Sequence, residues 1–447
     1  MPKERGLILG LSFFVISGHP EGWRLSDRDN DRERLDYYRD LAKISEGALL
    51  HFMFLGDSLD GASQITRGWT PSIDPVVLAS ALAAETQTLG FIPSTSSLYQ
   101  DPFTLARALA SLDHLNKGRT GWNILTSFYK DTARHNYTTG RDFRYEDRYE
   151  ISADFIKTVV KFWHAWQPGA IIRDKESGYY ADPEKVQPIS HRGPYFQVDG
   201  ALNVSRSPQE VPVMFVPVSS PQGQDFASAY GEVIFNRQNS FADMQTFYRT
   251  VKEKARGHGR SPDDVVVTPG AIIVLGDTEE EARRNYERIT SYIDHGKAFR
   301  QLESLFGWQE NEVAASSRAD SWPEIGSETG KVSNYAKALI EKAKKQNLTF
   351  EDLALEAAAS RGFLLLIGTA QSVADTLQYW YENEAVDGFV VGPIVAPDGV
   401  DDIATKLVPE LQRRGLFRSD APKGQTLRQA LGLKPYLSTQ PEGFGDE

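Results

Sequence analysis

The residues of this sequence that could bind a ligand are mostly neutral hydrogen-bonding groups placed where apolar runs end. They are His19, Asp57, Ser97, Asn123, Ser219 and Ser220. Hydroxyl groups, backbone N–H groups and a helix N-terminus can together hold a phosphate without a metal ion. No HxH or HExxH spacing supports a metal site. We therefore expect a site for an anionic cofactor or substrate.

The run GRTGWNILTS at 118–127 is the most informative stretch, because it combines a turn, a buried strand and polar residues at the end of that strand. Residues 102–116 before it have apolar residues at helical spacing and end at Asn116-Lys117-Gly118. The unit therefore reads as helix, tight turn and strand. Asn123 then lies near the carboxyl end of that strand, where open α/β sheets and (β/α) barrels place their ligands.

The remaining elements that would position these residues alternate between strand and helix. We expect eight buried strands, at about 6–14, 49–55, 89–93, 119–125, 211–216, 233–235, 265–275 and 388–391. Strands of this type, each followed by a helix, favour an α/β fold of the TIM (β/α)8 barrel type in a single domain, 1–447. We place insertions after strand 4 (about 128–204, with a small hairpin) and strand 7 (about 296–361), and a C-terminal surface arm at about 418–447.

The composition of the chain argues against several classes of function. The chain has 447 residues, a formal net charge of −12 and no cysteine. An acidic protein is a poor match for nucleic acid, and the lack of cysteine excludes disulfides and thiolate catalysis. No run reaches the roughly 18 apolar residues that a membrane helix needs. We expect a cytoplasmic enzyme acting on a small molecule, without a membrane partner.

An ordered set of motifs resembles a known family. GRTGWNILTS, PFTLARALASLDHL before it, GHPEGWR, SSPQG and DGFVVGP are similar to the bacterial-luciferase-like, FMN-dependent monooxygenases of the nitrilotriacetate, dibenzothiophene-sulfone and pristinamycin-type group. The likeness extends from Phe13 to about Gly432. It implies a luciferase-like TIM barrel that binds reduced FMN supplied by a separate NAD(P)H:flavin reductase, and a homodimer or homotetramer.

The resemblance also implies roles for individual residues. Flavin contacts would come from Asp57, Ser97, Tyr149, Ser219 and Ser220, and from Tyr145, which stands where the family usually has a histidine. Reduced FMN and dioxygen would form a C4a-(hydro)peroxyflavin that oxidises an aminopolycarboxylate, an organosulfur compound or a related small molecule. His19 or Asn123 would steady the peroxide by hydrogen bonding.

Two other functions stay open at this point. A metal-free TIM-barrel glycosidase is suggested by the 11% aromatic content and by acids near strand ends, Asp57, Glu232 and Asp387. A flavin-binding, luciferase-like protein without turnover is the other. Structural interpretations also compete at single residues, since Trp122 and His51 read better as core residues than as ligand contacts.

Overall fold

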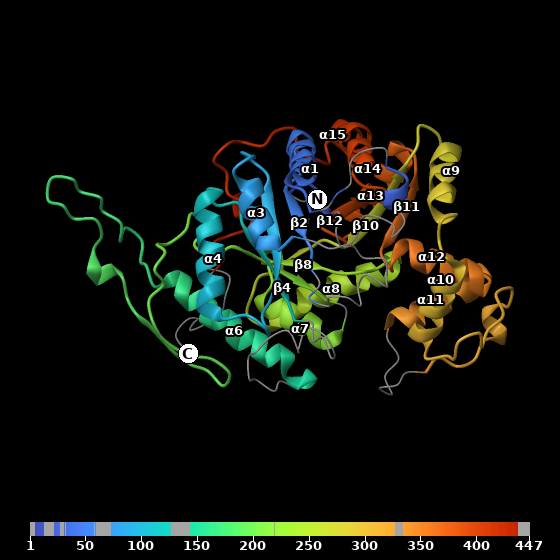
Figure 1. Cartoon of the computed structure of the whole chain (residues 1–447), viewed down its shortest axis with the longest axis horizontal. Helices are drawn as coiled ribbons and strands as arrows, with labels where there is room; N and C mark the ends of the chain where they lie inside the picture. Colours follow the sequence, from blue (N-terminus) through green and yellow to red (C-terminus); the bar gives the residue numbers. More distant parts are fainter. Residues whose placement is uncertain are drawn as a thin grey trace.

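A parallel sheet that curls back on itself forms the centre of the fold (Figure 1). The computed structural model describes residues 5–12, 22–26, 31, 33–57, 59, 73–126, 144–218, 220–326 and 334–436. Ten strands in these ranges form the sheet, in the spatial order β11-β10-β12-β1-β2-β3-β4-β7-β8-β9. Their bounds are β1 (Ile8–Ser12), β2 (Phe52–Leu55), β3 (Gly90–Ser96), β4 (Gly121–Leu125), β7 (Val213–Pro217), β8 (Val233–Phe235), β9 (Val266–Val267), β10 (Gly270–Leu275), β11 (Leu364–Gly368) and β12 (Gly388–Pro393).

The two ends of the sheet meet because β9 and β10 are halves of one run. β9 pairs with β8, whereas β10 pairs with β12, which in turn pairs with β1. The N–H of Asp387 donates to the Val267 carbonyl at 2.9 Å, and the N–H of Val390 donates to the Pro269 carbonyl at 2.9 Å. The arrangement is TIM-barrel-like.

Two details differ from the sequence prediction. The expected strand 265–275 is divided at Thr268-Pro269, because proline has no N–H to donate to a ladder. β11 was missed, and it pairs with the side of β10 that β12 leaves free. The sheet therefore has ten strands instead of the expected eight, because one expected strand is divided and β11 was missed.

The sheet separates two cores. Inside the curl, Phe52 packs on Phe215 and Phe54 on Phe235, with ring centroids 5.1 and 5.3 Å apart. Outside it, side chains of the opposite strand face pack against the surrounding helices. Trp122 belongs to this outer core, with Trp163 at 6.1 Å.

Helices surround the sheet, and most of them cover its outer face. They are α1 (Leu35–Gly47), α3 (Pro75–Ala83), α4 (Pro102–Leu115), α6 (Arg148–His164), α7 (Pro221–Tyr230), α8 (Phe241–Gly257), α9 (Glu279–Thr290), α10 (His295–Phe306), α11 (Asn334–Gln346), α12 (Phe350–Ser360), α13 (Ala370–Glu382), α14 (Asp398–Asp402), α15 (Val408–Arg413) and α16 (Leu427–Ala430). Asp74 and Asp101 cap α3 and α4, each followed by proline at the first helical position. No helix in the described ranges is long and apolar enough to cross a membrane.

Two segments stand outside this layer. The green segment after α6 projects from the body (Figure 1) and contains the antiparallel hairpin β5 (Ile189–Arg192) and β6 (Gln197–Gly200). On the opposite side, α10, α11 and α12 form a small core of their own around Phe306 and Phe350.

The prediction of a C-terminal surface arm is wrong for residues 427–436. Leu427, Leu431 and Leu433 are buried in the same core as the inner faces of the strands. The N–H of Leu427 donates to the Gly118 carbonyl at 2.8 Å, and a Cβ added at Gly90, the first residue of β3, would lie 2.8 Å from the Leu427 side chain. This segment therefore fills the amino end of the barrel.

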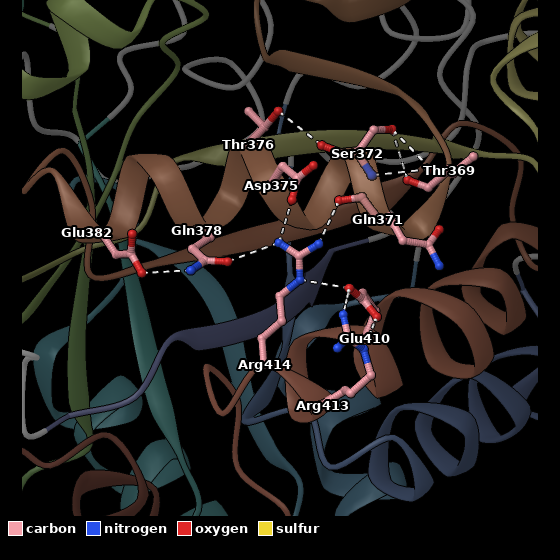
Figure 2. Close-up of polar contacts among 10 residues, drawn as sticks. All are labelled: Thr369, Gln371, Ser372, Asp375, Thr376, Gln378, Glu382, Glu410, Arg413 and Arg414. Atoms are coloured by element: carbon pink, nitrogen blue, oxygen red, sulfur yellow. Dashed lines mark hydrogen bonds and ion pairs between the residues drawn. The ribbon is translucent and has the colours of Figure 1, made fainter.

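An ion-pair network joins two outer helices (Figure 2). The Arg414 guanidinium, just after α15, donates to Glu410 at 2.8 Å and to Asp375 on α13 at 2.7 Å. Arg413 donates to both carboxylate oxygens of Glu410, at 2.7 and 2.8 Å. These hydrogen bonds from Arg413 and Arg414 lower the pKa of Glu410 to about 2.

Candidate active site at the carboxyl ends of the strands

Two hydroxyl groups meet at the start of α7, next to the carboxyl end of β7. Ser220 caps α7, and its hydroxyl accepts a hydrogen bond from the Gly223 N–H at 3.1 Å. The hydroxyl of Tyr149, in the first turn of α6, lies 3.1 Å from that of Ser220. A Cβ at position 223 would lie only 2.7 Å from the Tyr149 oxygen, so glycine is needed for this approach. The pair of hydroxyls beside a helix N-terminus suits a phosphate group.

The surroundings hold Tyr149 in place. Its ring packs on Phe226 of α7 at 5.4 Å, and the Arg148 guanidinium lies over the same ring at 4.2 Å from the centroid. Arg144, four residues before Arg148, donates to both carboxylate oxygens of Asp147 at 2.9 Å. Its charge is therefore already compensated.

Ser97 stabilises the same corner through hydrogen bonds. It is fully buried, its hydroxyl donates to the Leu125 carbonyl at 3.1 Å, and it lies 2.7 Å from the Ser152 hydroxyl. Ser152 in turn donates to the Arg148 carbonyl at 2.7 Å. Ser97 thus joins the ends of β3 and β4 to the first turn of α6. Its contact with flavin stays a prediction.

Asn123 points to the inner face of β4. β3 runs three residues beyond the predicted end at Pro93, so Ser94 is a strand residue opposite Asn123. The Asn123 amide nitrogen donates to the Ser94 hydroxyl at 2.7 Å, while its oxygen is buried without a partner. Exchanging the amide oxygen and nitrogen would leave the other atom unpaired. One polar atom of Asn123 is therefore available to a ligand in either orientation.

Two further buried hydroxyls without a partner share this inner face, and sequence reasoning missed both. They belong to Ser12, at the end of β1, and Thr268, between β9 and β10. The alternation of side chains places them on the same face as Ile8 and Val266. A buried hydroxyl without a partner costs about 1–3 kcal/mol, so a ligand or an ordered water that hydrogen-bonds to it would remove this cost. A polar residue interrupting an apolar run was the signal available in the sequence.

The other predicted site residues are only partly described. Asp57 is half-buried two residues after β2, at the carboxyl end of that strand. His19 and Ser219 lie outside the described residues. Tyr145 begins a short 3-10 helix (Tyr145–Asp147), but its side chain also lies outside what the structure describes.

Two of the three acids that suggested a glycosidase lie at the opposite end of the barrel from Asp57. Glu232 precedes β8 and is buried in an ion pair with Arg428. Asp387 precedes β12 and lies 3.2 Å from the Lys252 ammonium. Both are at amino ends of strands, whereas Asp57 is at a carboxyl end, so the three cannot form the facing carboxylate pair of a glycosidase. In the described ranges no cluster of three or more His, Asp or Glu side chains could hold a metal ion.

The core interpretations of two residues are confirmed. Trp122 is fully buried and its indole N–H donates to the Thr95 hydroxyl at 2.6 Å. His51 is buried, and its Nδ1 accepts from the Leu9 N–H at 3.2 Å. Burial lowers the pKa of His51 well below its ordinary value, so the ring is neutral.

Comparison with known proteins decides the family. The family model for luciferase-like monooxygenases matches residues 13–388. The chain belongs to this family. The resemblance read from the motifs is confirmed, and the glycosidase alternative loses its remaining support.

Its luciferase-like relatives include several enzymes with assigned reactions. The chain is 35% identical to N-acetyl-S-(2-succino)cysteine monooxygenase of Bacillus subtilis strain 168, over 97% of this chain and 98% of that protein. It is 34% identical to nitrilotriacetate monooxygenase component A of Aminobacter aminovorans, again over 97% and 98%. Among solved structures, riboflavin lyase RcaE with modified FMN and riboflavin is 30% identical, with a TM-score of 0.82, over 98% of this chain and 100% of that one.

Proposed function

We propose that this chain is the oxygenase of a two-component monooxygenase that uses reduced FMN and dioxygen to oxidise a small organic substrate. The observation that carries the proposal is the meeting of Tyr149, Ser220 and the N-terminus of α7 on the carboxyl-end rim of the barrel. Family membership supports the chemistry, and this corner supports FMN as the cofactor, because FMN ends in a phosphate.

The described residues fit FMN in two places. The hydroxyls of Tyr149 and Ser220, with the N–H groups of the first turn of α7, would hold the phosphate. Asn123, Ser12 and Thr268 offer buried polar atoms without partners on the inner face of the sheet, where they would hydrogen-bond to the cofactor or the substrate. Reduced FMN, when bound, supplies the reaction with dioxygen that transfers one oxygen atom to the substrate.

A separate NAD(P)H:flavin reductase is proposed as the partner. The relative named as component A of nitrilotriacetate monooxygenase is one part of a larger system. The sequence also lacks a G-x-G-x-x-G segment opening a helix after a strand, the dinucleotide-binding signature of Rossmann domains. A homodimer or homotetramer remains a prediction.

The substrate panel follows from the relatives and the resemblance. It comprises N-acetyl-S-(2-succino)cysteine, nitrilotriacetate and dibenzothiophene sulfone. We expect an oxidised product that forms only when photoreduced FMN, dioxygen and one panel member are all present, with one oxygen atom of dioxygen recovered in the product. Tight FMN binding with no product from any member would instead support a flavin-binding protein without turnover.

The two-component assignment has its own test. The purified chain with free FMN should not consume NADH until a flavin reductase is added. Rapid NADH consumption by the chain alone would contradict the two-component assignment. A chain that binds neither FMN nor reduced FMN would remove the flavin proposal altogether.

A further inference from the structure

An arginine with no anionic partner among the described residues lies on the same rim as the Tyr149–Ser220 corner. Arg237 follows the end of β8 by two residues, and β8 is the neighbour of β7 in the sheet. Pro217, the last residue of β7, pairs in register with Phe235, the last residue of β8. Arg237 and Ser220 therefore leave adjacent strands at the same end.

The guanidinium of Arg237 has no carboxylate or hydrogen-bond acceptor in contact among the described residues. Other arginines of this chain contrast with it. Arg414 contacts Glu410 and Asp375, and Arg428 pairs with Glu232. In a chain with a formal net charge of −12, a cation left without an acid on the functional rim needs an explanation.

One aromatic ring contacts this cation, and two more aromatic residues lie next to that ring or to the residue before it. Its guanidinium carbon lies 4.9 Å from the centroid of the Phe363 ring, and Phe363 packs on Phe235 at 6.0 Å. Tyr335 of α11 approaches from the helical segment, since a Cβ at Gly362 would lie 2.7 Å from its ring. Solvent reaches Arg237, yet the surrounding protein atoms lower the pKa of its guanidinium by desolvation.

This combination suits a ligand that carries both a negative charge and hydrocarbon. The planar guanidinium offers paired N–H groups that match the two oxygens of a carboxylate. A cation–π contact compensates only part of the lost hydration of a charged group, so an incoming anion gains more here than at an arginine with no desolvating neighbours. Phe235 and Phe363 supply apolar surface beside it.

We propose that Arg237 binds a carboxylate of the substrate, which makes organic acids the substrate class of this oxygenase. The inference rests on the proposed function. An acidic protein repels an anionic substrate at long range, and Arg237 supplies the local attraction that overcomes this repulsion. The other anion available on this rim is the FMN phosphate, and the experiment below separates the two.

The test compares two probes with the same thioether skeleton, one doubly charged and one neutral. Thiodiglycolate has a thioether and two carboxylates, and its dimethyl ester has the same thioether without charge. Binding of each to the FMN-loaded protein is followed by calorimetry and by the change in flavin absorbance, neither of which requires turnover. The variants are Arg237→Met, which removes the charge, and Arg237→Lys, which keeps the charge but not the planar fork.

We expect the wild-type protein to prefer the diacid over the diester. Arg237→Met should reduce that preference by about tenfold or more, and Arg237→Lys should fall between the two. The FMN dissociation constant should not change in either variant. A thermal unfolding midpoint near that of wild type would show that the variants are folded, and Arg237→Lys preserves the test if Arg237→Met is not.

Three outcomes would overturn the inference. The first is an equal affinity of the wild-type protein for the diacid and the diester. The second is a preference for the diacid in Arg237→Met that equals that of wild type. The third is an Arg237→Met variant that binds FMN more weakly than wild type but binds riboflavin equally well. The last would assign Arg237 to the flavin phosphate. Failure of the proposed function is distinguishable, because it would show as absent FMN binding or as no oxidised product from any panel member, while the binding preference at Arg237 is measured separately.

Discussion

The phenol oxygen of Tyr149 lies 3.1 Å from the hydroxyl oxygen of Ser220, although 71 positions separate the two residues. One belongs to the first turn of α6 and the other caps α7, so the contact fixes the two helices relative to each other at the rim. The site is therefore organised before a ligand arrives, which reduces the ordering cost of binding.

Ser220→Asp should weaken FMN binding by about 1–3 kcal/mol, because the new carboxylate would face the phosphate. Aspartate caps helices as well as serine, so α7 should keep its first turn. Ser220→Asn is the matched control, since asparagine has nearly the same shape and capping ability without the charge. An FMN dissociation constant in Ser220→Asp equal to that in Ser220→Asn would remove the phosphate from this loop.

Gly223→Ala should disturb the same corner without adding charge. The new methyl group would lie 2.7 Å from the Tyr149 oxygen, so the phenol must move away. We expect FMN binding to weaken by about 0.5–1.5 kcal/mol, the contribution of one hydrogen bond. Gly257→Ala, at the end of α8 with no atom within 4 Å of the added carbon, is the control. Equal FMN affinity in the two variants would mean that Tyr149 does not touch the cofactor.

Asn123→Leu separates a structural role from a catalytic one. If Asn123 only pairs with Ser94, the variant should lose about 1–3 kcal/mol of stability and keep its turnover per flavin-loaded molecule. If its free polar atom contacts the reacting groups, more hydrogen peroxide should be released per product formed.

The control for this prediction is Ser94→Ala, which removes the partner hydroxyl and keeps the amide. Peroxide release that rises in Asn123→Leu and stays at the wild-type level in Ser94→Ala would assign the role to Asn123. The same coupling of dioxygen to product in all three proteins would return Asn123 to a structural role.

Leu427→Ala should destabilise the fold by about 2–5 kcal/mol, because the side chain fills space inside the barrel. Leu115→Ala, at a residue that is 67% exposed, should change stability by less than about 0.5 kcal/mol. Urea denaturation of the two variants and wild type measures the difference. Similar midpoints for both variants would contradict the burial of the C-terminal segment.

The Glu410 network predicts a pH dependence of stability. The pKa of Glu410 is about 2 in the folded protein against an ordinary value of 4.5. A carboxylate whose pKa is lowered by folding stabilises fully above the ordinary value, and this contribution is lost as pH falls toward the folded value. The stability difference between wild type and Glu410→Gln should be constant above about pH 5 and shrink between 4.5 and 2. Glu280→Gln, at an exposed pair with Arg284, should show no comparable trend.

Local sequence patterns were sufficient to predict many of the helices and core residues on the outer side of the sheet. The range predicted for the helix before the central strand matches α4, because Asp101, Pro102 and Asn116 mark its ends. Trp122 and His51 were placed in the core on hydrophobic context alone, and both are there. Ser97, Asn123 and Ser220 were placed at the carboxyl ends of strands in the same way, because polar residues that end an apolar run indicate the end of a buried strand.

Long-range relationships could not be predicted from these patterns. Glu232 pairs with Arg428 across 196 positions, and no local signal connects them. α16 has only four residues, too few for a helical period, so Leu427 and Leu431 were read as part of a surface arm. Arg237 was not singled out, because a lone arginine after a strand carries no pattern until its surroundings are known.

The segment that fills the amino end of the barrel also determines when the protein can finish folding. β1 pairs with β12, and Leu427, Leu431 and Leu433 then cover apolar surface that includes the start of β3. A ribosome therefore releases the first half of the barrel long before its last partners have been made. During that interval the nascent chain presents an uncovered apolar interior, the condition under which chains aggregate or engage chaperones. The fold is therefore completed only after residues 427–433 have left the ribosome.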